Sequence, residues 1–345
     1  MNKVEKKIQN VYPYNDPQNY TRGTEYINCF YSSLFSFLIS NDKEILPYIA
    51  NNIFYYGYSP NQQDLRFKYG TQTILFQSLE KLNEEQGIQL IEERISSDKI
   101  INYIIEHINE DKMISVKVDM YELSYRPDRY KKIHTPHAFI IYGYNQIKKK
   151  FYILDNPENS DYREMECSYT DLQNAYKILY ETTTDPISYV WEKKELKNEY
   201  FDMTDYRKIF IKNLCSCRTL IFDKLECLKE LKKEVNFILS SESEKRKKGM
   251  ELFYLIHYQI LNVRRAELYA YYRLLGSEKL IKAFKEIIQR WEKVRVNVYR
   301  CIENKEINLE KVDEICRDIG DIYFNEIYFY KKLYKSIESI NLAKN

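Results

Sequence analysis

Beyond Thr204 the sequence carries the apolar periodicity of helices and no strand pattern. In the third expected helix, apolar residues recur at alternating spacings of four and three, the pattern of a helix that buries one face in a bundle. These residues are Leu280, Phe284, Ile287, Trp291, Val294, Val298 and Cys301. Residues 200–345 are therefore expected to form an all-α helical bundle domain. Its long helices are predicted near residues 204–239, 242–275, 277–303 and 309–340.

The first part of the chain mixes helix and strand signals, which places it in the α+β class. Strands are expected at residues 113–118, 138–144 and 150–154. The last two flank the polar tip Asn145–Lys148 and are predicted to pair as a hairpin. Residues 1–195 are expected to form this domain and to pack closely on the helical one. Its helices are predicted at residues 29–39, 72–85 and 97–109.

The composition restricts the functional classes. A net charge of only +2 over 345 residues argues against a nucleic-acid binder, which usually has a strong basic excess. No stretch approaches the roughly 18 consecutive apolar residues that a membrane span needs, and the polar N-terminal residues lack the apolar segment of a secretory signal. Seven cysteines, with no CxxC pair and no Cys/His cluster at zinc spacing, argue against disulfides and structural zinc. We therefore expect a cytoplasmic protein without metal or cofactor that binds neither membrane nor nucleic acid.

Charge is nonetheless distributed unevenly along the chain. Residues 191–345 carry a net charge of +7, and the first 190 residues carry a net charge of −5. The basic part suits an acidic protein partner, because complementary charge speeds encounter; the alternative is that its lysines are simply solvated. Lys245, Lys247 and Lys248 would contribute to such a surface. The amphipathic helices could also pair in a homodimer.

Cys29 is the first candidate for chemistry. It follows Asn28 and opens the apolar helix expected at residues 29–39. A thiol at a helix N-terminus meets the positive end of the helix dipole and free backbone N–H groups, and both favour the thiolate. The alternative is a small buried apolar residue, which is the role of most free cysteines.

The expected hairpin brings His137 and Asp155 together. His137 stands at the start of its first strand, and Asp155 ends its second. With Gln146 as the approximate tip, the two residues are equidistant from it and become cross-strand neighbours, with Cβ atoms about 5 Å apart. An imidazole beside a carboxylate is the base and orienter of a catalytic triad. A slip of one residue in register would substitute Asn156 for Asp155, and the sequence does not separate these alternatives.

Other interpretations of the histidines remain open. His134 lies only three residues upstream of His137, in the loop before the strand, and is a rival general base. His107 and His257 have the surroundings of ordinary helix residues. His137 and Asp155 could also be a surface pair without a catalytic role.

Four stretches of the first domain, in chain order, resemble the N-terminal domain of the butirosin-biosynthesis acyltransferase family. They are Asn28–Cys29, Val116–Tyr125, His137–Tyr144 and Leu154–Asn156. The resemblance covers roughly residues 20–190 and implies a papain-like cysteine-protease fold, related to the bacteriocin-processing cysteine peptidases. It also implies transfer of acyl groups from carrier-protein thioesters to amines in antibiotic assembly. Similar papain-like enzymes include the amide-forming type of closthioamide biosynthesis, which couples a carrier-bound acyl chain to a diamine.

Carried over to this sequence, the resemblance implies that Cys29 is the nucleophile, His137 the general base and acid, and Asp155 the orienter. The chain departs from papain-like peptidases because no glutamine stands a few residues before the cysteine to serve the oxyanion hole. Gln18 or Asn28, with the backbone N–H of Cys29, could take its place. Further candidates for substrate binding are Asp119, Tyr121 and Asn156.

The leading hypothesis is therefore acyl transfer in natural-product biosynthesis of the nonribosomal peptide kind. Cys29 would take an acyl group from an acyl or peptidyl carrier protein and pass it to a small amine, forming an amide. No cofactor is needed, because amide formation from a thioester runs downhill. The alternative is a papain-like cysteine peptidase or amidase that hydrolyses a peptide or amide with the same residues. A non-catalytic binding protein on the same scaffold is the third possibility.

Overall fold

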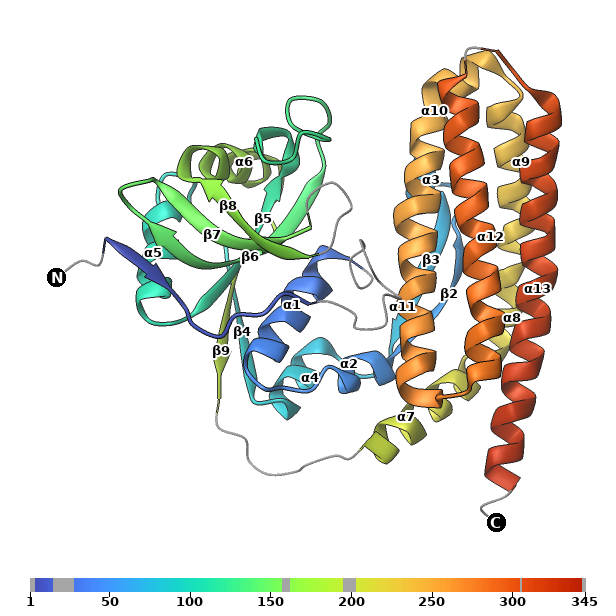
Figure 1. Cartoon of the computed structure of the whole chain (residues 1–345), viewed down its shortest axis with the longest axis horizontal. Coiled ribbons are helices and arrows are strands. Elements are labelled where there is room, and N and C mark those ends of the chain that lie inside the picture. The colour runs from blue at the N-terminus through green and yellow to red at the C-terminus, as the bar shows by residue number, and fades with distance from the viewer. Residues whose placement is uncertain (1–3, 15–27, 157–161, 195–202, 305, 343–345) are drawn as a thin grey trace. The chain divides into compact units, whose positions relative to one another are not determined.

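The computed structural model describes residues 4–14, 28–156, 162–194, 203–304 and 306–342 (Figure 1). The chain forms two compact units. The first unit comprises residues 1–45 and 77–200, and the second comprises residues 46–76 and 201–345. The fold class is α+β with a helical C-terminal region, as the sequence predicts. The units do not meet at a single boundary near residue 195, because residues 46–76 group with the helices.

The first unit is built on an antiparallel sheet. Its strands are β1 (Glu5–Lys7), β4 (Ile88–Glu93), β5 (Met113–Asp119), β6 (Pro136–Asn145), β7 (Lys150–Asp155), β8 (Arg163–Ser168) and β9 (Ser188–Lys193). The strand order is β4-β9-β5-β6-β7-β8, and β1 pairs with the C-terminal end of β6. The three strands expected from the sequence are β5, β6 and β7, so these predictions are confirmed.

Helices cover both faces of this sheet. On one face, α5 (Ile100–Asn109) and α6 (Tyr169–Thr182) share an apolar core with β5, β6 and β7. Helix α1 (Cys29–Ser40) contacts β6 and stacks on β9, where the rings of Phe37 and Trp191 lie 5.5 Å apart. Because Val190 belongs to the core under α5 and α6, its neighbour Trp191 points to the opposite face, and α1 covers that face. A short helix α4 (Leu79–Glu85) and a 3₁₀ turn η1 (Met120–Glu122) complete the unit.

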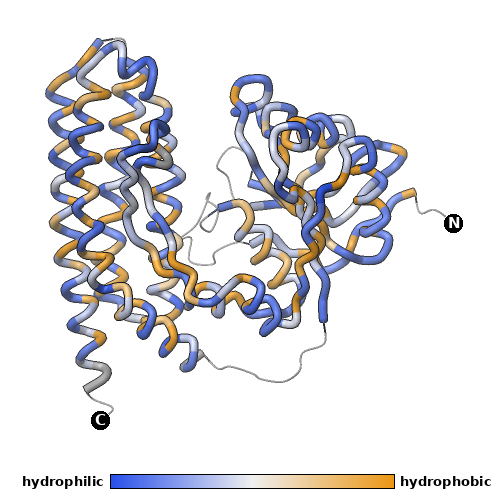
Figure 2. The backbone as a smooth tube through the Cα atoms, turned by 180° about the vertical axis from the view of Figure 1, so that it is seen from behind, coloured by the Kyte–Doolittle hydropathy of each residue, from blue (hydrophilic) through white to orange (hydrophobic). Residues whose placement is uncertain are grey.

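The second unit is dominated by helices. They are α7 (Met203–Ser216), α8 (Arg218–Leu225), α9 (Cys227–Leu239), α10 (Glu242–Tyr254), α11 (Asn262–Ala270), α12 (Glu278–Glu303) and α13 (Leu309–Leu342), with π-helical segments η3 (Leu255–Leu261) and η4 (Tyr271–Leu275). The predicted helical bundle is confirmed, and all seven residues of the expected seam on α12 are buried. Figure 2 shows polar and apolar positions alternating along these helices, as a one-sided apolar face requires.

Two helix predictions are wrong. The helix expected near residues 204–239 is divided into α7, α8 and α9. The helix expected at residues 72–85 is divided between β3 (Tyr69–Leu75) and α4. Strand β3 pairs along its length with β2 (Asn52–Tyr58), and short helices α2 (Leu46–Asn51) and α3 (Leu65–Lys68) flank β2. A local apolar pattern cannot reveal a strand whose partner precedes it by some twenty residues, because pairing is a tertiary contact. Among the described residues, no helix has the length and apolar character needed to cross a membrane.

A cluster of buried charge joins the β2–β3 hairpin to the helices of the second unit. The Tyr56 hydroxyl of β2 donates a hydrogen bond to Glu326 of α13, and the Trp291 indole donates to that hydroxyl at 3.1 Å. Arg264 of α11 lies 2.8 Å from Glu267 and 3.6 Å from Glu326. Burial raises the pKa of both carboxyl groups, that of Glu326 to about 7, while Arg264 opposes the rise. The guanidinium therefore holds two desolvated carboxyl groups in place.

We expect Arg264→Met to destabilise the second unit strongly. The substitution leaves Glu267 and Glu326 buried without a cation, and breaking a buried ion pair on one side typically costs about 3 to 5 kcal/mol. Urea unfolding followed by circular dichroism measures the decrease in the free energy of unfolding. Arg290→Met is the control, because Arg290 pairs with Asp321 at the surface and such pairs contribute about 1 kcal/mol or less. An equal decrease in the free energy of unfolding in the two variants would contradict a structural role for the cluster.

Candidate active site

Helix α1 begins at Cys29 because Asn28 caps it. The backbone of Asn28 is extended, and its side-chain Oδ1 accepts a hydrogen bond from the backbone N–H of Tyr31 at 3.1 Å. The N–H groups of the first helical residues have no partner inside the helix, so this end carries partial positive charge. No acidic side chain stands in the first turn to oppose it. The partly buried sulfur of Cys29 thus lies where negative charge is favoured.

His137 and Asp155 lie side by side at one end of the β6–β7 hairpin. Nε2 of His137 and Oδ1 of Asp155 are 2.7 Å apart, and the two residues are only 4% and 0% exposed. The Cys29 side chain is a further hydrogen-bond partner of His137. Because Asp155 occupies Nε2, Nδ1 is the ring nitrogen that can meet the sulfur. The three residues that the sequence analysis selected are therefore close together.

The hairpin register differs from the expected one. Ile140 of β6 pairs with Leu154 of β7, so the next residue, Asp155, stands opposite Phe139 rather than opposite His137. The prediction that His137 and Asp155 are directly opposed is therefore wrong by two residues. The turn is centred later in the chain than expected, which alone would shift the register by three residues, and a bulge between Ile141 and Gly143 reduces the shift to two. A shift of two keeps both side chains on one face of the sheet, since strand side chains alternate with a period of two. His137 and Asp155 consequently meet as diagonal neighbours.

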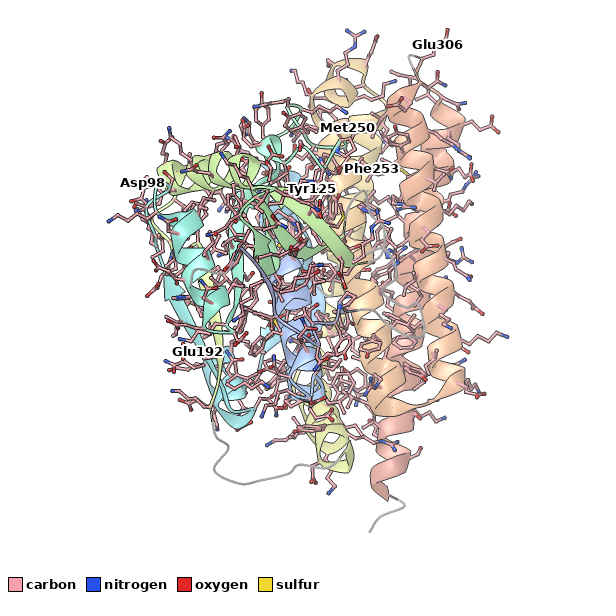
Figure 3. All side chains as sticks on the ribbon, turned by 60° about the vertical axis from the view of Figure 1, so that its left-hand side comes forward. Asp98, Tyr125, Glu192, Met250, Phe253 and Glu306 are labelled. Atoms are coloured by element: carbon pink, nitrogen blue, oxygen red, sulfur yellow. The ribbon has the colours of Figure 1, made fainter. Side chains whose placement is uncertain are left out.

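The carboxylate of Asp155 has partners besides His137. The Tyr125 hydroxyl donates to Oδ2 at 2.8 Å, and the backbone N–H of Asn156 donates to Oδ1 at 2.7 Å. The guanidinium of Arg126 lies 3.7 Å from Oδ2. Figure 3 labels Tyr125, which follows η1 in the loop after β5. Burial raises the pKa of Asp155, but the charges of His137 and Arg126, with hydrogen bonds from His137 and Tyr125, hold it below its usual range.

The protonation of His137 follows from these contacts. Burial lowers the pKa of the imidazole, but the charge and hydrogen bond of Asp155, together with Cys29, raise it to about 10. At neutral pH His137 therefore carries a proton and forms an ion pair with Asp155. A cation beside a cysteine sulfur stabilises the thiolate. The arrangement therefore places an imidazolium beside the Cys29 side chain.

Asp119 ends β5, and the structure places Tyr121 and His134 in the loop that follows it. Buried Asp119 accepts a hydrogen bond from the Tyr121 backbone N–H at 2.9 Å, and its other oxygen lies 3.1 Å from Nδ1 of His134. The rings of Tyr121 and His134 stack with centroids 4.2 Å apart. His134, whose side chain is 62% exposed, thus has its own carboxylate partner. These contacts hold the loop together, and no contact between them and Cys29 is seen in the described residues.

The remaining predicted site residues are Asn28, Asn156 and Gln18. The side-chain oxygen of Asn28 caps α1, which leaves its amide nitrogen as the donor. Asn156 reaches Asp155 through its backbone N–H, so its side chain is not the group that contacts His137. The Oδ1 of Asn156 is buried and has no hydrogen-bond partner among the described residues. Gln18 lies outside the described residues.

Sequence reasoning gave no role to Tyr125 or Arg126. Both follow η1 in an irregular loop, where side-chain direction has no periodicity from which it could be predicted. The run Arg126-Pro127-Asp128-Arg129 was the available signal, because two arginines beside one aspartate leave a cation for another carboxylate. Arg126 is 3% exposed and contacts both Asp128 and Asp155. Within the described residues, no group of three or more His, Cys, Asp or Glu side chains could hold a metal ion.

Comparison with known proteins gives one match. Residues 43–156 match the family model described as butirosin biosynthesis protein H, N-terminal. This range includes β5, β6 and β7 with His137 and Asp155, and it begins after Cys29. The resemblance to this family is therefore confirmed over that segment, whereas the match does not extend to the closthioamide type. No curated protein matches the chain.

We expect Cys29 to be the first cysteine to react with iodoacetamide near pH 7. Burial raises the pKa of every other cysteine, namely Cys167, Cys215, Cys217, Cys227, Cys301 and Cys316. Peptide mapping after partial labelling shows which cysteine reacts first. Cys29→Ala is the matched control and should abolish the fast phase. Earlier labelling of Cys215, the exposed cysteine, would count against the assignment.

We also expect Asp155→Asn to slow alkylation of Cys29 about 10-fold or more at pH 7. The raised pKa of His137 means that its proton is retained below about pH 10 and lost above it. Without the carboxylate, burial still lowers the pKa of the imidazole and only Cys29 is left to oppose it, so less of His137 is protonated at pH 7. The pH profile of the alkylation rate measures the change.

Asp119→Asn serves as the control for that experiment, because Asp119 is a buried aspartate beside a different histidine. At each pH, the alkylation rate of Cys29 in this variant should match that of the unmodified chain within about twofold. Identical profiles for Asp155→Asn and the unmodified chain would show that Asp155 does not set the charge of His137.

Proposed function

We propose that this chain, whose residues 43–156 carry a domain of the butirosin biosynthesis protein H family, is a biosynthetic acyltransferase that forms a thioester on Cys29. The family match indicates an enzyme of the acyltransferase type. The observation that supports the role of Cys29 most directly is the buried His137–Asp155 pair, which has the cysteine side chain as a further partner. In this proposal Cys29, His137 and Asp155, in this order along the chain, are the nucleophile, the base and the orienter of a catalytic triad.

Acylation would begin from the thiolate of Cys29. The sulfur attacks the carbonyl carbon of a thioester, a new carbon–sulfur bond forms, and the bond to the departing thiol breaks. His137 gives its proton to that departing sulfur, so a neutral thiol leaves. Asp155 keeps the imidazole oriented and stabilises its charged form. Exchange of one thioester for another is close to thermoneutral, so this step needs no external energy source.

Deacylation would use the imidazole as a base. After acylation His137 is neutral, and its Nδ1 can accept a proton from an amine as the amine nitrogen attacks the acyl-enzyme. The carbon–nitrogen bond forms, the bond to Cys29 breaks, and the thiolate–imidazolium pair returns. The product is an amide, which is more stable than the thioester. We assign the acceptor as a small amine and the donor as an acyl or peptidyl carrier protein, without a cofactor.

The oxyanion of each tetrahedral intermediate needs hydrogen-bond donors. The backbone N–H of Cys29, at the first position of α1, is one, because it has no acceptor within the helix. The amide nitrogen of Asn28 is the second donor in this proposal, since its oxygen is used by the cap. Loss of one such donor typically lowers the rate by about 10² to 10³.

Intact-mass analysis tests the proposed acyl-enzyme. After incubation with butyryl-N-acetylcysteamine, a small thioester, we expect a mass gain of one butyryl group on the unmodified chain. Cys29→Ala should show none, and its turnover should fall by about 10⁴-fold or more, as for removal of other catalytic nucleophiles. Addition of a primary amine should then release the amide.

The same experiment separates transfer from hydrolysis. Release of butyrate with no amide, at saturating amine, would favour the cysteine amidase or peptidase alternative. No mass gain with either a small or a carrier-bound thioester, in a folded protein, would overturn acyl transfer. Asn28→Ala should slow both steps, whereas Asn28→Asp, which retains a capping oxygen without a donor, separates the capping role from the donor role.

A further inference from the structure

The outer surface of the second unit contains a basic groove. It has a volume of about 720 Å³ and lies between α12 and α13, which run as neighbouring helices in Figure 1. Thirteen residues line it, of which five are lysine or arginine and two are acidic. Figure 3 shows long side chains projecting outward from this pair of helices. A shallow groove between two packed helices is a form that accepts a third helix.

The charge of the groove is only partly neutralised within the chain. Lys293 lies 3.0 Å from Glu314 and 2.9 Å from Asp318. By contrast, Lys279, Lys282 and Lys332 form no ion pair within the part of the chain that the structure describes. These three lysines outnumber Glu286, the acidic lining residue that forms no ion pair with the described residues, so the groove has a local positive potential that attracts an acidic partner.

Exposed aromatic residues accompany these lysines. Tyr328 lines the groove with 59% of its surface exposed, and Phe324, one turn earlier on α13, is 68% exposed. The ammonium of Lys332 lies 4.1 Å from the centre of the Tyr328 ring. Exposed tyrosine beside unpaired cations is the composition of a binding surface, because aromatic residues supply the buried contact and charge supplies the orientation.

We infer that this groove docks the acyl-donor carrier protein through an acidic helix, an inference that rests on the proposed function. The carrier proteins of acyl transfer are acidic, which complements the unpaired lysines. Tyr328 and Phe324 would cover the apolar residues of the docked helix. Docking raises the effective concentration of the carrier-bound thioester at Cys29 when the phosphopantetheine arm of the carrier reaches the sulfur. The surface differs from the one that the sequence indicated: Lys245 is buried, and its ammonium donates to the carbonyl of Asn304 at 2.8 Å.

The test compares two triple charge reversals with the same change in net charge. One variant carries Lys279→Glu, Lys282→Glu and Lys332→Glu in the groove. The control carries Lys233→Glu, Lys247→Glu and Lys248→Glu, which lie on α9 and α10 and do not line the groove. The probe is a stand-alone acidic acyl carrier protein charged with butyryl-phosphopantetheine. Its Kd is measured by fluorescence anisotropy at about 0.1 M salt, in the Cys29→Ala background.

We expect the Kd for the carrier protein to rise at least about 10-fold in the groove variant and to change by no more than about twofold in the control variant. With active enzyme, kcat/KM for the carrier-bound thioester should fall similarly, while kcat/KM for butyryl-N-acetylcysteamine stays unchanged. Tyr328→Ala, which leaves the charge intact, should weaken binding about 3-fold to 10-fold. Circular dichroism verifies that each variant is folded.

Each result decides the inference. Unchanged carrier binding in the folded groove variant would overturn it, and so would an equal loss in the control variant. Loss of activity on the small thioester as well would show that the lysines act on the site and not on docking. A chain that binds the carrier through the groove but leaves both thioesters intact would overturn the proposed function and support the docking surface.

Discussion

Burial of the Asp155 carboxylate at the end of β7 removes a charge from water at a cost of several kcal/mol, and the candidate site is arranged around offsetting that cost. The backbone of Asn156, the Tyr125 hydroxyl, the Arg126 guanidinium and the imidazole of His137 all reach its two oxygens. Their combined effect keeps the carboxylate charged, and the charged carboxylate in turn keeps His137 protonated. The charge on the imidazole beside Cys29 therefore depends on a carboxylate with which Cys29 has no described contact.

The second unit also compensates buried carboxyl groups, in the cluster around Arg264. Arg264 holds two buried carboxyl groups, and tyrosine hydroxyls from β2 and the helices donate to one oxygen of each. Here the buried charges join segments that are distant in sequence, because Tyr56 and Glu326 are 270 residues apart. The same physics thus maintains a reactive arrangement in one unit and a structural joint in the other.

The family-matched segment contributes to both units. It begins before α2, includes the β2–β3 hairpin that packs with the helices, and continues through the strands that carry His137 and Asp155. The helical unit is consequently not an independent addition to the sheet-containing unit. Its hairpin is supplied by the segment that also carries His137 and Asp155, whereas the proposed docking groove is lined by residues outside that segment.

The sequence alone determined the features that depend on local periodicity and chemistry. The seam of α12, the strands β5, β6 and β7, and the helix that begins at Cys29 follow from patterns of 3.6 and two residues and from the capping preference of asparagine. The pairing of the two strands that carry His137 and Asp155 was predictable from local patterns, whereas the bulge between Ile141 and Gly143 that keeps their side chains on one face was not. Tertiary structure decided what no local pattern encodes. The pairing of β3 with β2, the roles of Tyr125 and Arg126, and the difference between buried Lys245 and the groove lysines all depend on which residues meet across long separations. Long-range pairing and burial arise only when the chain closes on itself, and a single sequence records them only through their local consequences.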